Sequence, residues 1–342
     1  MALEQFRALT GKIGMNTDNK LLFSIIIPVY QAANSLTECV QSCLEQRYVD
    51  PSEVELILVD DGSTDGSGDL CDELAAKDSR ITVRHTGNSG VSHARNIGIE
   101  LAQGRFILFV DSDDTVSSDL LSNLIKHADE ETLLVDETKN FWSAQKVSGF
   151  QYIENSVLDA NTHVWGKLFD RECLNEGKIR FIEGLAIGED LLFLIDLGMF
   201  IGKKRAVRCI YGDDYNYTDN ENGAMNSSFK KSYLDQIICW KRTEEKLLTV
   251  KENLSPYAFV SVAVSQILTA LLVAGKVATQ RGQRDQDLDK LAVDEARGQI
   301  NHALKTRGAF AALSAGHKFK VALLRTNPDL YLKLYAKHKN IN

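Results

Sequence analysis

Continuous apolar segments recur along the first third of the chain, and each is followed by a stretch with helical spacing. The segments 23–29, 54–60, 81–85 and 105–110 have the length of strands. Runs without polar alternation are typical of strands buried on both faces, and alternating strands and helices favour parallel pairing. The pattern therefore predicts an α/β fold with a Rossmann-like, mainly parallel sheet and helices on both faces.

Acidic residues stand where two of these strands end. The second strand ends in Asp60 and Asp61, and the fourth leads into the segment 111–114, Asp-Ser-Asp-Asp. Carboxylates packed this densely repel one another and need a cation to be tolerated. Hard oxygen ligands favour Mg²⁺ or Mn²⁺ over zinc, and these ions keep open positions for substrate phosphates. Because ligands of open α/β sheets bind at the carboxyl ends of the strands, we predict a metal and ligand site at this edge.

The composition is typical of a soluble enzyme, since 44% of the 342 residues are hydrophobic. The six cysteines form no C-x-x-C pair, so we expect buried reduced thiols and a cytoplasmic location. Residues 1–20 lack the apolar centre of a signal peptide. The longest apolar stretch, 258–275, contains Ser261, Gln266 and Thr269, which predicts a packed helix in preference to a membrane span.

Three regions are expected along the chain. Residues 1–20 form an N-terminal extension, residues 21–228 a catalytic domain, and residues 229–342 a helical region with a basic end.

In the second half of the expected catalytic domain, the spacing of apolar residues becomes less regular. The segments 164–175 and 188–200 have the spacing of amphipathic helices, with a strand at about 206–211. The polar segment 213–228 is expected to be a mobile lid.

The charge is distributed unevenly, because the chain carries −8 in total but residues 301–342 contain eight Lys or Arg and one Asp. Such a basic end suits an anionic acceptor or the anionic inner face of a membrane, which would make the protein peripheral there. A solvated helix bundle that mediates a homodimer is the alternative. Nucleic acid is not expected as a partner.

Five motifs, in this order, resemble those of the inverting, nucleotide-sugar-dependent glycosyltransferases of family 2, which have the GT-A fold. The motifs are IIIPVYQ, LVDDGSTD, GNSGVSHARNIGI, FVDSDD, and the pair HVWGKLFDRECL and IRFIEGLAIGEDLLF. The resemblance covers roughly residues 23–230. It implies bacterial enzymes of polysaccharide, capsule or cell-wall synthesis.

The resemblance also implies roles for individual residues. Those expected to bind the nucleotide-sugar are Pro28, Tyr30, Asp60, Asp61, Arg95, Asp111 and Ser112. Asp113 is expected to bind the metal, Asp190 to act as the general base with Glu189 beside it, and Trp165 and Lys167 to line the acceptor side.

Plainer roles remain open for several of these residues. Asp60 and Asp61 also fit a turn that caps a helix, and Arg95 would then only neutralise them. The carboxylates at 189–190 would favour the start of any helix, and Trp165 would fit a core.

The function implied is metal-dependent, inverting transfer of a hexosyl or N-acetylhexosaminyl group from a UDP-sugar to a hydroxyl of a glycan or lipid-linked acceptor. Mn²⁺ or Mg²⁺ is the expected cofactor. Two alternatives stay open: a haloacid-dehalogenase-type phosphatase with Asp111 as nucleophile and Asp113 as acid and base, and a non-catalytic nucleotide-sugar binder. The phosphatase motif normally opens its fold, whereas three strands precede it here.

Overall fold

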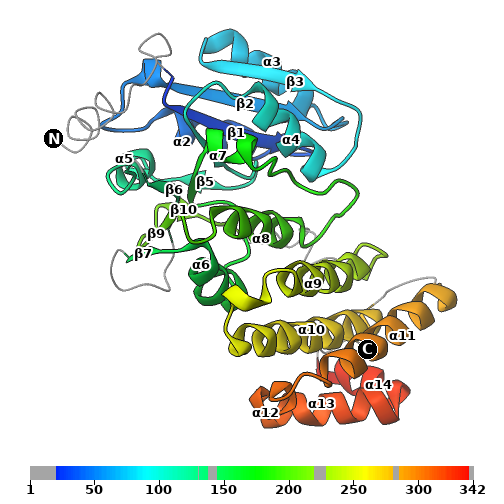
Figure 1. Cartoon of the computed structure of the whole chain (residues 1–342). Helices are drawn as coiled ribbons and strands as arrows, with labels where there is room; N and C mark the ends of the chain where they lie inside the picture. The colour runs from blue at the N-terminus through cyan, green and yellow to red at the C-terminus, as the bar shows by residue number, and fades with distance from the viewer. Residues whose placement is uncertain (1–20, 130, 138–144, 219–228, 280–284, 339–342) are drawn as a thin grey trace. The chain divides into compact units, whose positions relative to one another are not determined.

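The computed structural model describes residues 21–129, 131–137, 145–218, 229–279 and 285–338 (Figure 1). The expected N-terminal extension, residues 1–20, lies outside this part. The chain divides into two compact units. The first comprises residues up to 157 together with 161–184 and 193–219, and the second comprises 158–160, 185–192 and the remainder.

Eight strands of the described chain form one sheet in the first unit, in the order β3-β2-β1-β4-β8-β6-β9-β7. Their bounds are β1 Phe23–Val29, β2 Val54–Asp60, β3 Ile81–His85, β4 Phe106–Phe109, β6 Thr132–Glu137, β7 Gln145–Val147, β8 Lys167–Asp170 and β9 Ala206–Ile210. Four of the seven neighbouring pairs are parallel, including all three within β3-β2-β1-β4. The predicted mainly parallel α/β sheet is confirmed.

Helices cover both faces of this parallel half. Alternate residues of β1, such as Ile25 and Ile27, share a core with α2 (Leu36–Leu44) and α5 (Leu120–Ile125). On the other face Ile26 meets α4 (Val91–Leu101), so closely that a Cβ on Gly98 would lie 2.3 Å from its Cγ2. The glycine therefore lets α4 approach the strand and brings the start of the helix to the carboxyl end of the sheet. The other α-helices that lie wholly in this unit are α3 (Ser67–Lys77), α6 (Gly149–Asn155) and α7 (Arg171–Glu176).

One local expectation was wrong, and another is met by a short strand at its start. The helix expected at 164–175 is the strand β8 followed by α7, because all four residues of β8 are buried between β4 and β6 in antiparallel pairing. At the start of α2, Ser35 makes no side-chain cap among the described contacts, since its hydroxyl donates to the carbonyl of Ser112, 2.9 Å away. The expected lid is ordered at its start, where β10 (Tyr215–Asn216) pairs with β5 (Thr115–Val116). Residues 219–228 of that expected lid lie outside the described part.

The described part of the second unit is helical beyond residue 229, as predicted. Its main helices are α9 (Tyr233–Leu248), α10 (Pro256–Val277), α11 (Gln286–Ala303), α12 (Ala309–Ala312), α13 (Ala315–Thr326) and α14 (Pro328–His338). The 22-residue α10 is long and apolar enough to cross a membrane, with a mean hydropathy of 2.0 over its best window. Yet 56% of that window is buried, and Ile267 and Ala274 sit in a core shared with α9 and α11. The expected packed helix fits these contacts.

All six cysteines are buried and unpaired, as expected: Cys39, Cys43, Cys71, Cys173, Cys209 and Cys239. Burial raises the pKa of the Cys71, Cys173, Cys209 and Cys239 thiols to about 12. These four thiols are therefore uncharged at neutral pH.

Candidate active site

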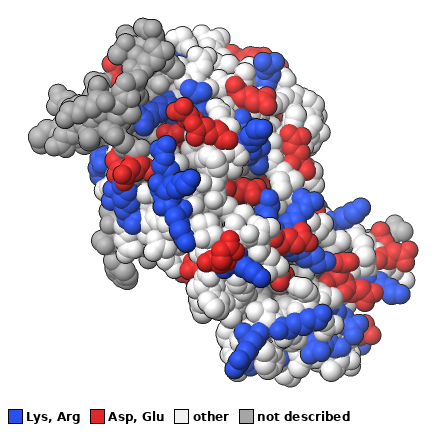
Figure 2. Space-filling view, viewed as in Figure 1, with Lys and Arg blue, Asp and Glu red and all other residues white. Residues whose placement is uncertain are grey.

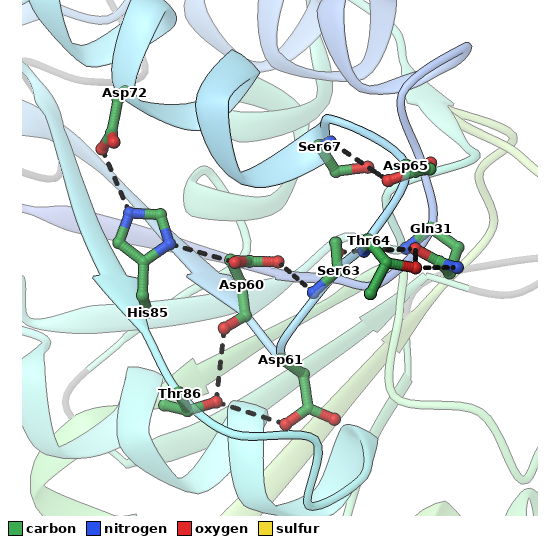
Figure 3. A network of polar contacts seen from close by, with 10 residues as sticks. All are labelled: Gln31, Asp60, Asp61, Ser63, Thr64, Asp65, Ser67, Asp72, His85 and Thr86. Carbon is green, nitrogen blue, oxygen red and sulfur yellow. Dashed lines mark hydrogen bonds and ion pairs between the residues drawn. The ribbon is translucent and has the colours of Figure 1, made fainter.

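The loops that follow β1 and β2 are joined by Gln31. Its side-chain oxygen accepts the backbone N–H of Thr64 (2.8 Å), and its own N–H donates to the Ser63 hydroxyl (3.1 Å). Gln31 has a left-handed φ of 52°, which is unusual for a residue with a side chain. These contacts hold the loop after Asp61 against the end of β1 (Figure 3). Tyr30, immediately before, is half exposed, whereas Pro28 is buried in the strand.

Asp60 lies between Ser63 and His85 at the end of β2 (Figure 3). Its carboxylate accepts the Ser63 N–H (3.0 Å) and lies 3.0 Å from His85 Nδ1, while His85 Nε2 lies 3.1 Å from Asp72. The hydrogen bonds to Asp60 and then Asp72 raise the pKa of His85. Burial opposes ionisation of Asp60, but the bonds from His85 and Ser63 outweigh it and hold its pKa low. His85 was not predicted, since a single histidine at a strand end carries no motif.

Asp61 supports the start of α4. Its carboxylate accepts the backbone N–H groups of Gly90 (2.7 Å) and Ser89 (2.9 Å), and Asp61 as a whole is 4% exposed. An anion is favoured at this helix start by the exposed N–H groups. A plainer role, a carboxylate that holds the turn before a helix, therefore fits these contacts, and nucleotide binding by Asp60 and Asp61 remains a prediction.

Arg95 connects α4 with the acidic loop after β4. Its Nη2 lies 2.9 Å from Asp111 Oδ1, and its guanidinium stacks 5.2 Å from the centre of the Phe181 ring. The side chain is 5% exposed. The carboxyl ends of β2 and β4 are thus linked through one helix, which Asp61 contacts at its start and Asp111 one turn later. The sequence predicted these residues to be close but did not predict this ion pair.

The aspartates of the loop after β4 differ in burial. Asp114 is 1% exposed and accepts hydrogen bonds from the Tyr215 hydroxyl and the Thr218 N–H, both at 2.7 Å. Burial, with the negative charges of Asp111 and Asp113, raises its pKa to about 6. The side chain of Asp111 is 30% exposed, and Asp113 is also partly exposed.

This arrangement fits a divalent cation of the magnesium type. The described residues contain no cluster of three or more metal-ligating side chains. Mg²⁺ and its analogues need no such cage, because they bind through one or two carboxylates plus substrate phosphates. Asp111 and Asp113 are two partly exposed carboxylates whose charges already disfavour ionisation of the neighbouring Asp114. A cation between them would relieve that repulsion.

An aromatic stack lies beside the end of β4. The rings of His163 and Trp165 are 3.5 Å apart, and Trp165 stacks on Tyr215 (4.5 Å) and Tyr217 (6.1 Å). Trp165 also bridges to Phe109, the last residue of β4. Burial lowers the pKa of His163 to about 2, so the imidazole is neutral. Only Trp165 was predicted to be part of the site.

Lys167 is not where the sequence placed it. The expectation that it lines the acceptor side is wrong for this structure, because its side chain is 0% exposed and pairs with Asp136 at 2.9 Å. It also donates to Asn161 Oδ1 (2.9 Å). The reason is that Lys167 is the first residue of β8, a strand whose four residues are all buried.

Glu189 and Asp190 occupy the first turn of α8 (Glu189–Ile201), which starts in the second unit and continues in the first. Gly188, immediately before, has a φ of 93°, and a Cβ there would lie 2.9 Å from Cys239 Sγ of α9. Acidic residues are favoured at a helix start by its dipole. The positions of Glu189 and Asp190 therefore suit both a general base and a carboxylate pair that only stabilises the start of the helix. The role of general base remains a prediction.

A family model described as glycosyl transferase family 2 matches residues 24–146, which include β1 to β4 and both acidic loops. EpsJ of Bacillus subtilis (strain 168), an uncharacterized glycosyltransferase, is 27% identical over 93% of this chain and 96% of its own length. Residues 24–146 are therefore similar to glycosyl transferase family 2, and most of the chain is similar to EpsJ. The chain spans only part of some other relatives, such as the glycosyltransferase GlyG of Streptococcus pneumoniae serotype 4, which is 42% identical over 32% of this chain and 36% of GlyG.

The fold of this chain is similar to that of S. aureus TarS. The crystal structure of TarS 1–349 aligns with a TM-score of 0.64 and 18% identity, over 94% of this chain and 92% of that one. A second structure of the same protein, in complex with UDP-GlcNAc, aligns with a TM-score of 0.59. The expected GT-A fold is therefore confirmed. The match to the glycosyl transferase family 2 model and the similarity to EpsJ favour a glycosyltransferase over the phosphatase alternative.

Proposed function

We propose that this chain is a glycosyltransferase that takes its sugar from a UDP-activated donor and transfers it, with inversion, to a hydroxyl of a glycan or lipid-linked acceptor in bacterial surface polysaccharide synthesis. The observation that carries the proposal is the link between the acidic loops after β2 and β4, made through Asp61, α4 and the Arg95–Asp111 pair. These loops lie at the carboxyl ends of parallel strands, where nucleotides bind in open α/β sheets. The UDP-GlcNAc complex of similarly folded TarS supports a uridine nucleotide.

The nucleotide would lie over the ends of β1 and β2. Tyr30, half exposed beside Pro28, offers a ring face to the base. Asp60 and Asp61 lie at the end of β2, the strand paired with β1, and Ser112 lies in the loop that would carry the metal. A carboxylate can accept the ring N–H of uracil or a ribose hydroxyl, which gives these residues their proposed role.

Asp113, with Asp111 beside it, would hold Mn²⁺ or Mg²⁺. When bound, such an ion supplies positive charge to the departing diphosphate. Arg95 holds the carboxylate of Asp111 in place. Trp165 would line the acceptor side. Lys167 is not included, because it is fully buried.

Asp190 would remove the proton from the acceptor hydroxyl, with Glu189 as its neighbour. An alcohol is a poor nucleophile until a positioned base takes its proton. The support is the resemblance of the GED motif to the family's base and the place of both residues in the first turn of α8. Attack from the face opposite to the departing UDP gives inversion in a single displacement.

The donor is tested with the full chain and a panel of UDP-sugars, with and without Mn²⁺. A ligand at a hundredfold excess over its Kd stabilises the folded state by about 2.7 kcal/mol, which a thermal melt detects. We expect one UDP-sugar to raise the melting temperature only with metal and to release UDP slowly, and faster with an acceptor. Stabilisation without any UDP release would instead indicate a binding protein, and hydrolysis of phosphate monoesters that is lost with Asp111→Asn would indicate the phosphatase.

The helices α12 to α14 support an attachment to anionic membrane. Figure 2 shows Lys and Arg side chains gathered on this end of the second unit. The exposed cations of these helices and their flanks are Lys305, Arg307, Lys320, Arg325, Lys333 and Lys337, and Asp329 is the one acidic residue described among them. Phe319 (63% exposed), Phe310 (46%) and Leu334 (43%) add apolar contacts. Each cation near an anionic bilayer contributes about 1 kcal/mol, so several give a peripheral, salt-sensitive attachment.

Cosedimentation tests this attachment. The full chain is expected to bind vesicles that contain phosphatidylglycerol at low salt and to be released at high salt, with no binding to neutral vesicles. Lys333→Glu/Lys337→Glu should weaken the binding, whereas Lys77→Glu, an exposed lysine of α3 in the first unit, should not. Equal binding to neutral vesicles would contradict the proposal, and a concentration-dependent dimer without vesicle binding would favour the homodimer alternative.

A further inference from the structure

The acidic loop after β4 is held in place by a segment about a hundred residues later. Directly after the loop, β5 pairs with β10 in antiparallel register, with Tyr215 opposite Val116. Tyr215 is 7% exposed, so its ring lies inside the first unit. The pairing places its hydroxyl within reach of the loop.

The hydroxyl of Tyr215 contacts both ends of the loop. It accepts the backbone N–H of Asp111 (3.1 Å) and donates to Asp114 Oδ2 (2.7 Å). The other oxygen of Asp114 accepts the Thr218 N–H (2.7 Å), so both oxygens of this carboxylate bind the segment around β10. A phenol has one proton to give, and here it goes to the buried carboxylate.

The ring is fixed as well as the hydroxyl. Trp165 stacks on Tyr215 with a centroid distance of 4.5 Å and an interplanar angle of 17°. Trp165 in turn bridges to Phe109, at the end of the strand that enters the loop. The β-bridge is made by the backbone of Trp165, so the ring of Tyr215 packs on a residue that is itself tied to the end of β4.

The contacts distinguish Asp111 and Asp114, which are held by neighbouring residues, from Asp113. Asp114 is turned inward at 1% exposure, while Asp111 is held by Arg95 through its side chain and by Tyr215 through its backbone. The side chain of Asp113, between them, is left at the partly exposed surface.

We propose that Tyr215 is a positioning residue for the metal and diphosphate: its hydroxyl fixes the loop 111–114 so that the carboxylate of Asp113 is presented to the cation. The inference rests on the proposed function, because it takes this loop as the metal site. It adds a residue that touches neither donor nor acceptor and acts through Asp111 and Asp114. Partners that orient metal ligands in this indirect way typically change metal affinity by about 10- to 100-fold when they are removed.

The test compares Tyr215→Phe with a matched control in the full chain. Tyr215→Phe keeps the ring on Trp165 and removes only the hydroxyl. Tyr211→Phe makes the same change at a residue that is 60% exposed and precedes β10. Titration calorimetry gives the Kd for Mn²⁺ in the presence of UDP, and the Kd for UDP in the absence of metal.

We expect Tyr215→Phe to raise the Kd for Mn²⁺ by about tenfold and Tyr211→Phe to leave it unchanged. The affinity for UDP without metal should not change, and UDP release from the donor should recover at saturating Mn²⁺. A purely structural role would instead lower stability and the active fraction at every metal concentration.

Equal Kd values for Mn²⁺ in Tyr215→Phe and wild type would overturn the inference. If the wild type bound UDP but no Mn²⁺, the metal site itself would be refuted and the inference with it. Tyr215→Phe leaves Oδ2 of the buried Asp114 without its hydrogen-bond donor, so a second pair of variants guards against loss of folding. Asp114→Asn is compared with Asp114→Asn/Tyr215→Phe, and the double variant should bind Mn²⁺ about tenfold more weakly than the single one; equality here refutes the inference too.

Discussion

Lys167 and Asp136 form an ion pair inside the sheet, with 2.9 Å between nitrogen and oxygen and no exposed surface on either side chain. They lie directly opposite each other on β8 and β6. Asp136 also accepts hydrogen bonds from Asn161 (2.7 Å) and Ser156 (3.2 Å). The lysine expected to meet substrate therefore serves to balance a buried carboxylate.

Removing one partner of this pair should be costly. Lys167→Met leaves an uncompensated charge on Asp136, for which we expect a loss of about 3–5 kcal/mol in the free energy of unfolding, measured with urea. The control is Lys146→Met, a lysine in an exposed ion pair with Glu131, where the loss should be at most about 1 kcal/mol. The double variant Lys167→Met/Asp136→Leu should recover part of the loss. Equal costs for both lysines would show that the buried pair is unimportant.

Asp113→Asn should abolish metal-dependent affinity for UDP while the fold remains intact. The change removes an anionic oxygen ligand from a partly exposed position at a strand end. Calorimetry with Mn²⁺ and UDP measures the effect, and circular dichroism checks the fold. Asp119→Asn, a surface carboxylate paired with Arg47, is the control. Unchanged metal-linked binding in Asp113→Asn would move the metal site elsewhere.

Asp190→Asn should leave donor binding nearly unchanged and reduce transfer by about a hundredfold or more, the usual effect of removing a general base. Steady-state transfer to the acceptor measures kcat, and calorimetry measures donor binding. Asp196→Asn tests a carboxylate farther along the same helix, where transfer should persist. Should Glu189→Gln abolish transfer while Asp190→Asn does not, the two roles are exchanged.

Glu137 should make stability depend on pH. Burial, followed by repulsion from Asp214, Asp213 and Asp136, raises its pKa to about 7 from an ordinary value of 4.5. The folded state therefore binds the proton more tightly than the unfolded state, and this group's stabilising contribution is full below about pH 4.5 and lost as the pH rises to about 7.

Glu137→Gln removes this dependence but keeps an oxygen for the Asp214 N–H. The stability of the variant relative to wild type should rise by about 2 kcal/mol between pH 5 and pH 8, measured by urea unfolding. The exposed Glu176→Gln should show no such trend. Parallel pH profiles for Glu137→Gln and wild type would contradict the raised pKa.

Gly188→Ala should disturb the start of α8 more than a left-handed backbone alone explains. A Cβ at Gly188 would meet Cys239 at 2.9 Å, whereas at Gly184, with a similar φ of 81°, it would meet nothing within 4 Å. Gly184→Ala should therefore cost about 1–2 kcal/mol from φ strain, and Gly188→Ala about 1–3 kcal/mol more. Thermal melts compare them, and a loss of transfer confined to Gly188→Ala would follow from displacement of Asp190.

The first three strands were predicted with the bounds that the structure has, because each is a continuous apolar run that ends in turn-forming residues. β8 was predicted as part of a helix. Its apolar residues fit either period, and what makes it a strand is pairing with β4 and β6, which are distant in sequence. Local pattern alone does not contain that information.

The candidate site was likewise predicted only in part. The motifs identified Asp61, Arg95, Asp111 and Asp113, but the partners that hold them could not be predicted. Tyr215 lies 104 residues from Asp111 in the chain, in a segment whose composition suggested only a polar loop. Such contacts depend on the sheet order, which places β10 beside β5.

The labelling rates of the cysteines can report how often parts of the protein open. Every thiol is buried, and five of the six belong to the first unit, with Cys239 alone in the second. A maleimide reacts with a buried thiol only after local or global opening exposes it. The rate at which each cysteine is labelled, read by mass spectrometry, therefore reports the opening of the two units separately and without any added probe.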